Sequence, residues 1–168
     1  EYQLVGKFVV GYIGTHGMAH ALDKVLDAAE MLKDDDNIRI LFAGGGAERT
    51  NLEQGVKQRG LTNVVMMPRQ PKAMMPAVWS LCDTSLISLR NALLFTKVIP
   101  SKIFESMGMG LPMIISCPEG ECTGIIRDTQ SGVVVQPEDP ELLAACIRQL
   151  NENPERLQKL ALASSNSA

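Results

Sequence analysis

The sequence contains few aromatic residues and no excess of positive charge. Its 168 residues include four Phe, two Tyr and one Trp, and 16 Lys and Arg stand against 19 Asp and Glu, for a formal net charge of -3. Domains that bind duplexes are usually basic, and domains that bind single strands need aromatic side chains on which bases stack. The composition therefore argues against a nucleic-acid partner.

Long apolar runs and paired cysteines are also missing. No run approaches the roughly 20 residues of a membrane-spanning helix, and no signal peptide precedes Tyr2. The four cysteines form no Cys-x-x-Cys pair, and nothing completes a zinc site around Cys117 and Cys122. We therefore expect a cytoplasmic protein with reduced thiols, of which Cys122 is accessible if its loop lines a cleft.

Two common nucleotide-binding fingerprints are absent. No Gly-x4-Gly-Lys-[Ser/Thr] motif occurs, which excludes a P-loop. Gly11, Gly14 and Gly17 are spaced three apart, unlike Gly-x-Gly-x-x-Gly, and no acidic residue ends the second predicted strand, which disfavours a nicotinamide dinucleotide. The loop from Gly14 to Gly17 is either a phosphate-binding loop that presents backbone N–H groups or simply a tight turn between strand and helix.

The patterns that are present predict one α/β domain. Apolar residues make up 45% of the chain and charged residues 21%, as in ordinary globular proteins. Short apolar runs alternate with helical patterns, which predicts a Rossmann-like parallel sheet with helices on both faces and a ligand at the carboxyl ends of the strands. The predicted strands are 8–13, 38–43, 64–67, 84–89, 112–116 and 132–135, and the predicted helices are 20–32, 47–59, 74–81, 102–109, 122–129, 140–150 and 154–163. We expect a long loop over 90–100 and a frayed end over 164–168.

Several polar residues follow the predicted strands. His16 either contacts a ligand or is a surface residue, and His20 is expected to lie at the surface or at a hinge. Arg69 either bonds a flat group or is a solvated loop residue. The carboxylates of Asp34–Asp36 precede the second strand and so lie at the opposite end of the sheet, which leaves no expected metal site.

The most informative stretch runs from Ile99 to Met113. Ser101 is predicted to cap a helix whose first N–H groups, at Lys102 and Ile103, attract a diphosphate. Lys102 adds a positive charge. Glu105, one turn further on, either accepts hydrogen bonds from ribose hydroxyls or is a surface residue of an amphipathic helix.

Five segments together resemble a known family. The chain resembles the C-terminal, donor-binding domain of retaining glycosyltransferases of the GT-B fold, family 4 or group 1, and is similar to those that act on lipid-linked acceptors in surface-polysaccharide assembly. The segments are Gly11–Gly14, Leu41–Arg49, Leu81–Leu89, Pro100–Ser116, and Pro118–Glu121 with the following Gly132–Asp139.

The resemblance implies a function for the whole of residues 1–168. It implies a UDP-sugar as the donor and no metal cofactor. It also implies a lipid-linked or glycan acceptor held by an N-terminal domain that is missing here. The chain opens without Met, directly on a predicted strand, which agrees with a missing upstream part. We expect the isolated domain to bind the donor at most, and the full-length protein to act in the cytoplasm, in peripheral association with the inner face of the membrane.

The resemblance also implies roles for individual residues. Glu105 matches the second glutamate of the family's Glu-x7-Glu motif and would bind ribose, whereas Lys97 stands in place of the first glutamate. The Arg/Lys pair of many relatives is not evident, so His16 and Lys102 are the catalytic candidates that would neutralise the leaving diphosphate. The remaining candidates are Ser101 and Ile103 for the diphosphate, Gly14, Thr15 and Gly17 for phosphates and sugar, and Arg69 and Gln70 for the nucleobase.

Two other functions stay open at this point. A UDP-sugar epimerase of the same fold uses a similar nucleotide site, although no clear set of its acidic and histidine residues is present. A non-catalytic sugar-nucleotide-binding domain would fit the missing glutamate at Lys97.

Overall fold

A computed structural model describes residues 2–168 and contains one six-stranded sheet in the order β3-β2-β1-β4-β5-β6. All neighbouring strands are parallel. After β3 the chain crosses back to place β4 on the other side of β1, so the strand order reverses between β1 and β4, which confirms the predicted Rossmann-like α/β fold. The strands are β1 (Phe8–Thr15), β2 (Ile38–Gly45), β3 (Val64–Met67), β4 (Thr84–Ser88), β5 (Met113–Ser116) and β6 (Gly132–Val135).

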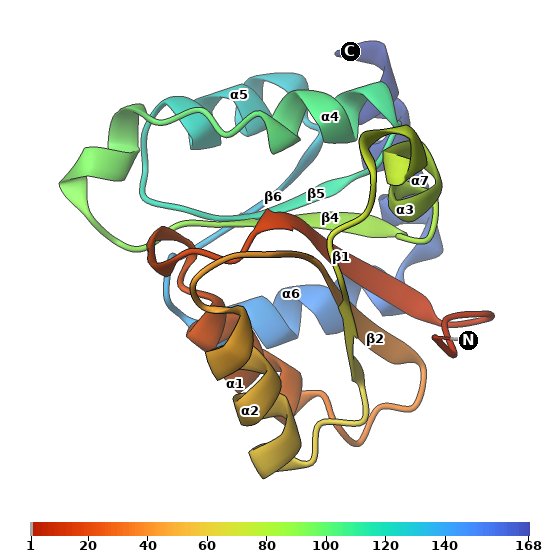
Figure 1. Cartoon of the computed structure of the whole chain (residues 1–168). Helices are drawn as coiled ribbons and strands as arrows, with labels where there is room; N and C mark the ends of the chain where they lie inside the picture. The colour runs from red at the N-terminus through yellow and green to blue at the C-terminus, as the bar shows by residue number, and fades with distance from the viewer. Residues whose placement is uncertain (1) are drawn as a thin grey trace.

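Helices cover both faces of the sheet (Figure 1). One face carries α1 (Leu22–Met31), α2 (Arg49–Arg59) and α6 (Pro140–Glu152). The other carries α3 (Met75–Trp79), α4 (Lys102–Gly108) and α5 (Glu121–Thr129), while α7 (Pro154–Asn166) packs against α4 and α6. Three 3-10 turns, η1 (Met18–His20), η2 (Lys72–Met74) and η3 (Leu93–Lys97), lie in loops that follow β1, β3 and β4.

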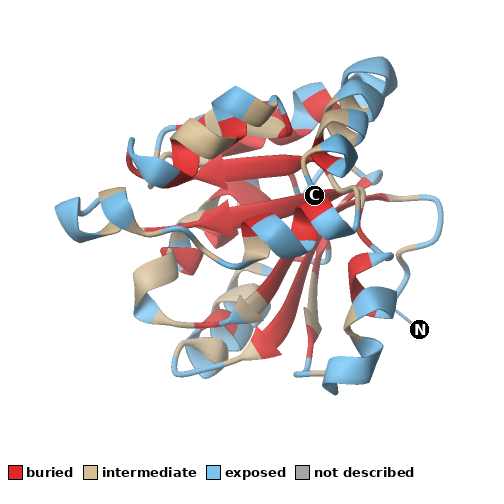
Figure 2. Cartoon of the chain, turned by 90° about the horizontal axis from the view of Figure 1, so that it is seen from above, coloured by how far each residue is buried: buried red, intermediate tan, exposed pale blue. Residues whose placement is uncertain are grey.

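The apolar strands are buried from both sides, as Figure 2 shows. On β1 the side chains of Val10 and Tyr12 enter the core under α1 and α6, whereas those of Val9 and Ile13 enter the core under α3. Such strands read as continuous apolar runs because neither face meets water. This explains why the sequence pattern predicted every strand of the sheet.

The sheet is least paired between β1 and β4. β1 pairs with β2 through eight residues, but with β4 only through Val10↔Thr84 and Gly11↔Ser85. Beyond these pairs, toward the carboxyl ends, β1 and β4 are no longer paired. In open parallel sheets this reversal point is where ligands bind.

The stretch 90–100 is part of the long loop between β4 and α4, as predicted, and contains the 3-10 turn η3. Two other local predictions are wrong. The predicted frayed end is helical as far as Asn166, and the buried Ser164 holds it by donating a 2.7 Å hydrogen bond to the carbonyl of Leu111. Cys122 is buried rather than accessible, because it packs in the core under α4 and α5, and all four cysteines are free thiols.

Candidate functional site

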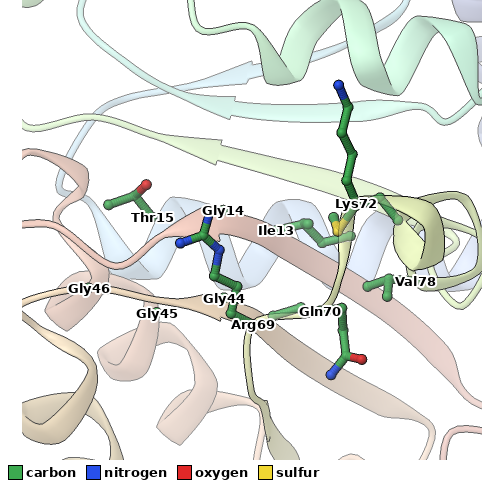
Figure 3. A pocket seen from close by; sticks show the side chains of 12 residues that line it. Ile13, Gly14, Thr15, Gly44, Gly45, Gly46, Arg69, Gln70, Lys72 and Val78 are labelled. Atoms are coloured by element: carbon green, nitrogen blue, oxygen red, sulfur yellow. The ribbon is translucent and has the colours of Figure 1, made fainter.

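A cavity of about 680 Å³ opens at the carboxyl ends of β1 and β2 (Figure 3). Its volume lies in the range of small-molecule and cofactor sites. The cavity is floored by the ends of the two strands and walled by the loop that leads from β3 into α3. The lining residues are Ile13, Gly14, Thr15, Ala43, Gly44, Gly45, Gly46, Arg69, Gln70, Lys72, Met75 and Val78.

Glycine is required where the ends of β1 and β2 touch. Gly44 has a φ of +148°, and a Cβ atom there would lie 1.9 Å from the carbonyl oxygen of Gly14. Gly46 has a φ of +150°, and its Cβ would lie 2.5 Å from the carbonyl oxygen of His16. Side chains are therefore excluded, and a ligand can approach the backbone of both strands closely.

The lining of the cavity carries positive but no negative side chains. Arg69 and Lys72 are exposed, neither forms an ion pair within residues 2–168, and no Asp or Glu lines the cavity. Figure 3 shows the Arg69 guanidinium reaching toward Gly14, whereas the Gln70 amide points the other way. Gln70 donates its amide to the carbonyl of Pro68 at 3.0 Å. The cavity is thus suited to an anionic ligand.

Lys102 approaches the end of β1 from α4. Its Nζ donates to the Tyr12 hydroxyl at 2.9 Å and lies 4.0 Å from the centre of the Tyr12 ring. A Cβ atom on Gly14 would lie 2.5 Å from Lys102 Cε, so the side chain crosses directly over this glycine. Burial lowers the pKa of Lys102 to about 8. The structure therefore places Lys102 beside the Gly14–Thr15 backbone.

The start of α4 differs from its prediction. Ser101 has helical backbone angles and makes no side-chain cap, so its predicted capping hydrogen bond is wrong. Its hydroxyl instead donates to Glu105 at 3.0 Å. The side chain of Ile103 is buried in the core, and its N–H donates to the carbonyl of Pro100 at 3.1 Å. Glu105 is exposed on the first turn of the helix.

The two histidines differ in their surroundings. His16 is fully buried, and neither ring nitrogen has a hydrogen-bond partner. Burial, together with the positive charges of Arg49 and Lys102, lowers the pKa of His16 to about 4. His20 is half-buried, with Nδ1 3.2 Å from the carbonyl oxygen of Ser88. The His16 ring has no exposed atom, so the structure does not bring it to the cavity, and its catalytic role stays a prediction.

The predicted site residues form two groups. Gly14, Thr15, Arg69 and Gln70 line the cavity, and Lys102 touches Gly14 from above. Gly17, Ser101, Ile103 and Glu105 lie outside the cavity lining. The sequence reasoning missed Lys72 and Tyr12. Lys72 was recognisable as a second cation in the loop that contains Arg69, whereas Tyr12 reads as an ordinary core residue of its strand.

The described residues contain neither a cluster of metal ligands nor a helix that could span a membrane. Within residues 2–168 no three His, Cys, Asp or Glu side chains are grouped so that they could hold a metal ion. None of the helices in the same range is both long and apolar enough to cross a bilayer.

The chain is similar to known transferases over nearly its whole length. A family profile described as "Glycosyl transferases group 1" matches residues 3–166. The putative colanic acid biosynthesis glycosyl transferase WcaI of Escherichia coli K12 is 30% identical over 145 residues, which are 85% of this chain and 35% of that protein. The chain spans between 35% and 41% of the length of the curated relatives that it matches.

Solved structures share the fold. Anabaena Alr3699/HepE in complex with UDP superposes with a TM-score of 0.83 at 18% identity, over 97% of this chain and 44% of that one. The C-terminal domain of the group 1 glycosyl transferase LpcC from Francisella tularensis gives 0.79 at 20% identity, over 96% of this chain and 84% of that one.

Proposed function

Since this chain belongs to the group 1 family of glycosyl transferases, we propose that it is the domain that binds the UDP-sugar donor of such an enzyme. The transferred sugar goes to a lipid-linked or glycan acceptor with retention of configuration. The observation that carries this proposal is the cavity at the carboxyl ends of β1 and β2, which has Arg69 and Lys72 in its lining and Lys102 beside it. The HepE structures in complex with UDP and with UDP-glucose support the choice of donor.

We assign roles within this domain from the family resemblance, and of the residues concerned Gly14, Thr15, Arg69 and Gln70 line the cavity. Gly14, Thr15 and Gly17 face the phosphates and the sugar, with Ser101 and the backbone of Ile103 at the far side of the diphosphate. Arg69 and Gln70 lie near the nucleobase, and Glu105 binds the ribose. Lys102 stabilises the negative charge that develops on the leaving diphosphate, which is the main electrostatic demand of the reaction.

The remainder of the enzyme lies outside this chain. An N-terminal domain binds the acceptor, and the whole protein works at the cytoplasmic face of the membrane. Turnover of a UDP-sugar by the full-length protein, with a new glycosidic bond in the product, would distinguish a transferase from an epimerase or a non-catalytic binding domain. The domain alone is expected to bind donor without transfer.

Glu105→Gln is expected to weaken UDP binding about tenfold or more, measured by titration calorimetry. The carboxylate accepts hydrogen bonds from ribose hydroxyls, and bonds to a charged acceptor are each worth about 1.5–3 kcal/mol. Glu141→Gln provides a matched control because Glu141 is exposed on α6 and lies outside the cavity lining. Equal affinity of the Glu105 and Glu141 variants would refute the ribose assignment.

Donor binding is expected to be independent of divalent metal. Titrations of UDP-glucose in EDTA and in excess Mg²⁺ should give affinities within about twofold, because the cationic side chains supply the positive field themselves. A tenfold gain in affinity with Mg²⁺ would contradict this prediction.

A further inference from the structure

Lys102 and Tyr12 come from opposite faces of the sheet. Tyr12 is fully buried in the core under α1 and α6, whereas α4 packs through Ile103 into the core of the other face. Their side chains meet at the carboxyl end of β1, beyond the last residue that pairs with β4. The contact between Lys102 and Tyr12 therefore connects the two faces of the sheet at the point where β1 and β4 are no longer paired.

The hydrogen bonds of the Tyr12 hydroxyl have a fixed direction. The carbonyl of Thr15 can only accept, so the hydroxyl proton points to it, at 2.7 Å between the oxygens. The ammonium of Lys102 can only donate, so the phenolic oxygen accepts from it at 2.9 Å. Tyr12 thus links Lys102 to the backbone of the loop at the edge of the cavity.

Within residues 2–168, contacts other than an ion pair stabilise the positive charge of the Lys102 ammonium. Within the part of the chain that the structure describes, no carboxylate lies within ion-pair distance of its Nζ. The titratable groups that face it are Glu105 on α4, Cys117 after β5, and Tyr12, His16 and His20 on or after β1. Of these groups, Tyr12 contacts the ammonium, through both its hydroxyl and its ring. One N–H therefore bonds Tyr12, and the other two have no hydrogen-bond partner within residues 2–168.

From this arrangement we propose that Tyr12 is the positioning residue for Lys102: it holds the ammonium over Gly14, keeps it charged and ties it to the Thr15 carbonyl, ready for the donor diphosphate. This inference rests on the proposed function. The hydroxyl acts through Lys102 and touches no part of the donor itself. Removal of the Tyr12 hydroxyl changes both the position and the pKa of the Lys102 ammonium.

Tyr12→Phe keeps the ring and removes the hydroxyl. Without this acceptor the charged form of Lys102 is less stable, so its pKa falls below about 8. UDP-glucose is a suitable probe because its diphosphate is esterified at both ends and keeps its charge between pH 6 and pH 8.5. We expect its affinity to fall about tenfold at pH 8 and only about threefold at pH 6, where Lys102 remains charged in both proteins.

The first measurement is UDP-glucose affinity against pH for the wild type, Tyr12→Phe and Tyr2→Phe. Tyr2 is the other tyrosine of the chain and is exposed, so Tyr2→Phe should follow the wild type. A merely structural role for Tyr12 would lower affinity equally at all pH values. Parallel pH profiles for wild type and Tyr12→Phe would therefore overturn the inference.

The second measurement needs no donor. The Lys102 amine is titrated by NMR in the ligand-free chain, and its signal is assigned from its loss in Lys102→Met. An unchanged Lys102 pKa in Tyr12→Phe overturns the inference, whatever the affinities. If UDP-glucose fails to bind the wild type, the proposed donor function fails, while the amine titration still decides whether Tyr12 sets the charge of Lys102.

A third protein covers the case in which Tyr12→Phe does not fold. The Tyr2→Phe chain labelled with 3-fluorotyrosine carries the label only at Tyr12, because the sequence has two tyrosines. Fluorine weakens the phenolic oxygen as an acceptor with little change of shape. A lowered Lys102 pKa supports the inference, and an unchanged one overturns it.

Discussion

Gly44→Ala is expected to lower the free energy of unfolding by about 3 kcal/mol or more and to abolish UDP binding. The new Cβ would lie 1.9 Å from the carbonyl oxygen of Gly14, on the neighbouring strand. The φ of +148° adds strain for any residue with a side chain. Overpacking and backbone strain each cost about 1–3 kcal/mol, and here the strands must separate at the floor of the cavity.

Gly45→Ala is the matched control for this variant. Gly45 is the last residue of β2, but no atom lies within 4 Å of its Cβ position and its φ is not positive. Chemical denaturation should give a stability close to that of the wild type, and calorimetry should still detect UDP. If the Gly44 and Gly45 variants were equally stable, the close approach of β1 and β2 would not determine the shape of the site.

Stability is expected to fall by about 3 kcal/mol between pH 6.5 and pH 4 because of His16 alone. In the unfolded chain this histidine takes up a proton near its ordinary pKa of 6.5, whereas in the folded chain burial holds the pKa at about 4. Protons therefore bind preferentially to the unfolded state across this window. The loss is absent above pH 6.5, grows by about 1.4 kcal/mol per pH unit below it, and levels off below pH 4.

His16→Phe tests this contribution. Neither nitrogen of His16 has a partner, so the replacement ring loses no hydrogen bond and should leave stability at pH 7 unchanged or higher. Denaturation across the pH range should then show that the free energy of unfolding of His16→Phe falls less steeply below pH 6.5 than that of the wild type. His20→Gln should keep most of the wild-type slope. A slope unaltered by His16→Phe would mean that His16 is protonated as easily in the folded protein as in the unfolded one.

The fold was largely predictable because its signals are local. Buried parallel strands such as β2 and β5 are nearly continuous apolar runs, interrupted in β2 by Arg39, and α1 and α6 place their apolar residues at helical spacing. The placement of Arg69 and Gly14 at one edge followed from the rule that parallel strands end on the same side. The ends of elements were less predictable, since Ser164 is held by a contact with Leu111, 53 residues away in the sequence.

The details of the site were less accessible to sequence reasoning. The contact between Lys102 and Tyr12 depends on how far β1 and β4 separate, which no local pattern records. Ser101 has a good capping side chain, but its hydroxyl bonds Glu105, so the local preference was overridden by a neighbour one turn along the helix. His16 looked like a loop residue because its burial comes from tertiary packing beside Phe42 and Tyr12.

The short pairing between β1 and β4 has a mechanical consequence. Two register pairs join β3-β2-β1 to β4-β5-β6, so the seam of the sheet runs beside the cavity. Lys102 on one side of this seam and Gly14 on the other would both contact a bound diphosphate. The bound donor would then connect the two half-sheets. Part of its binding free energy would make the domain more rigid and stabilise the whole of it against unfolding.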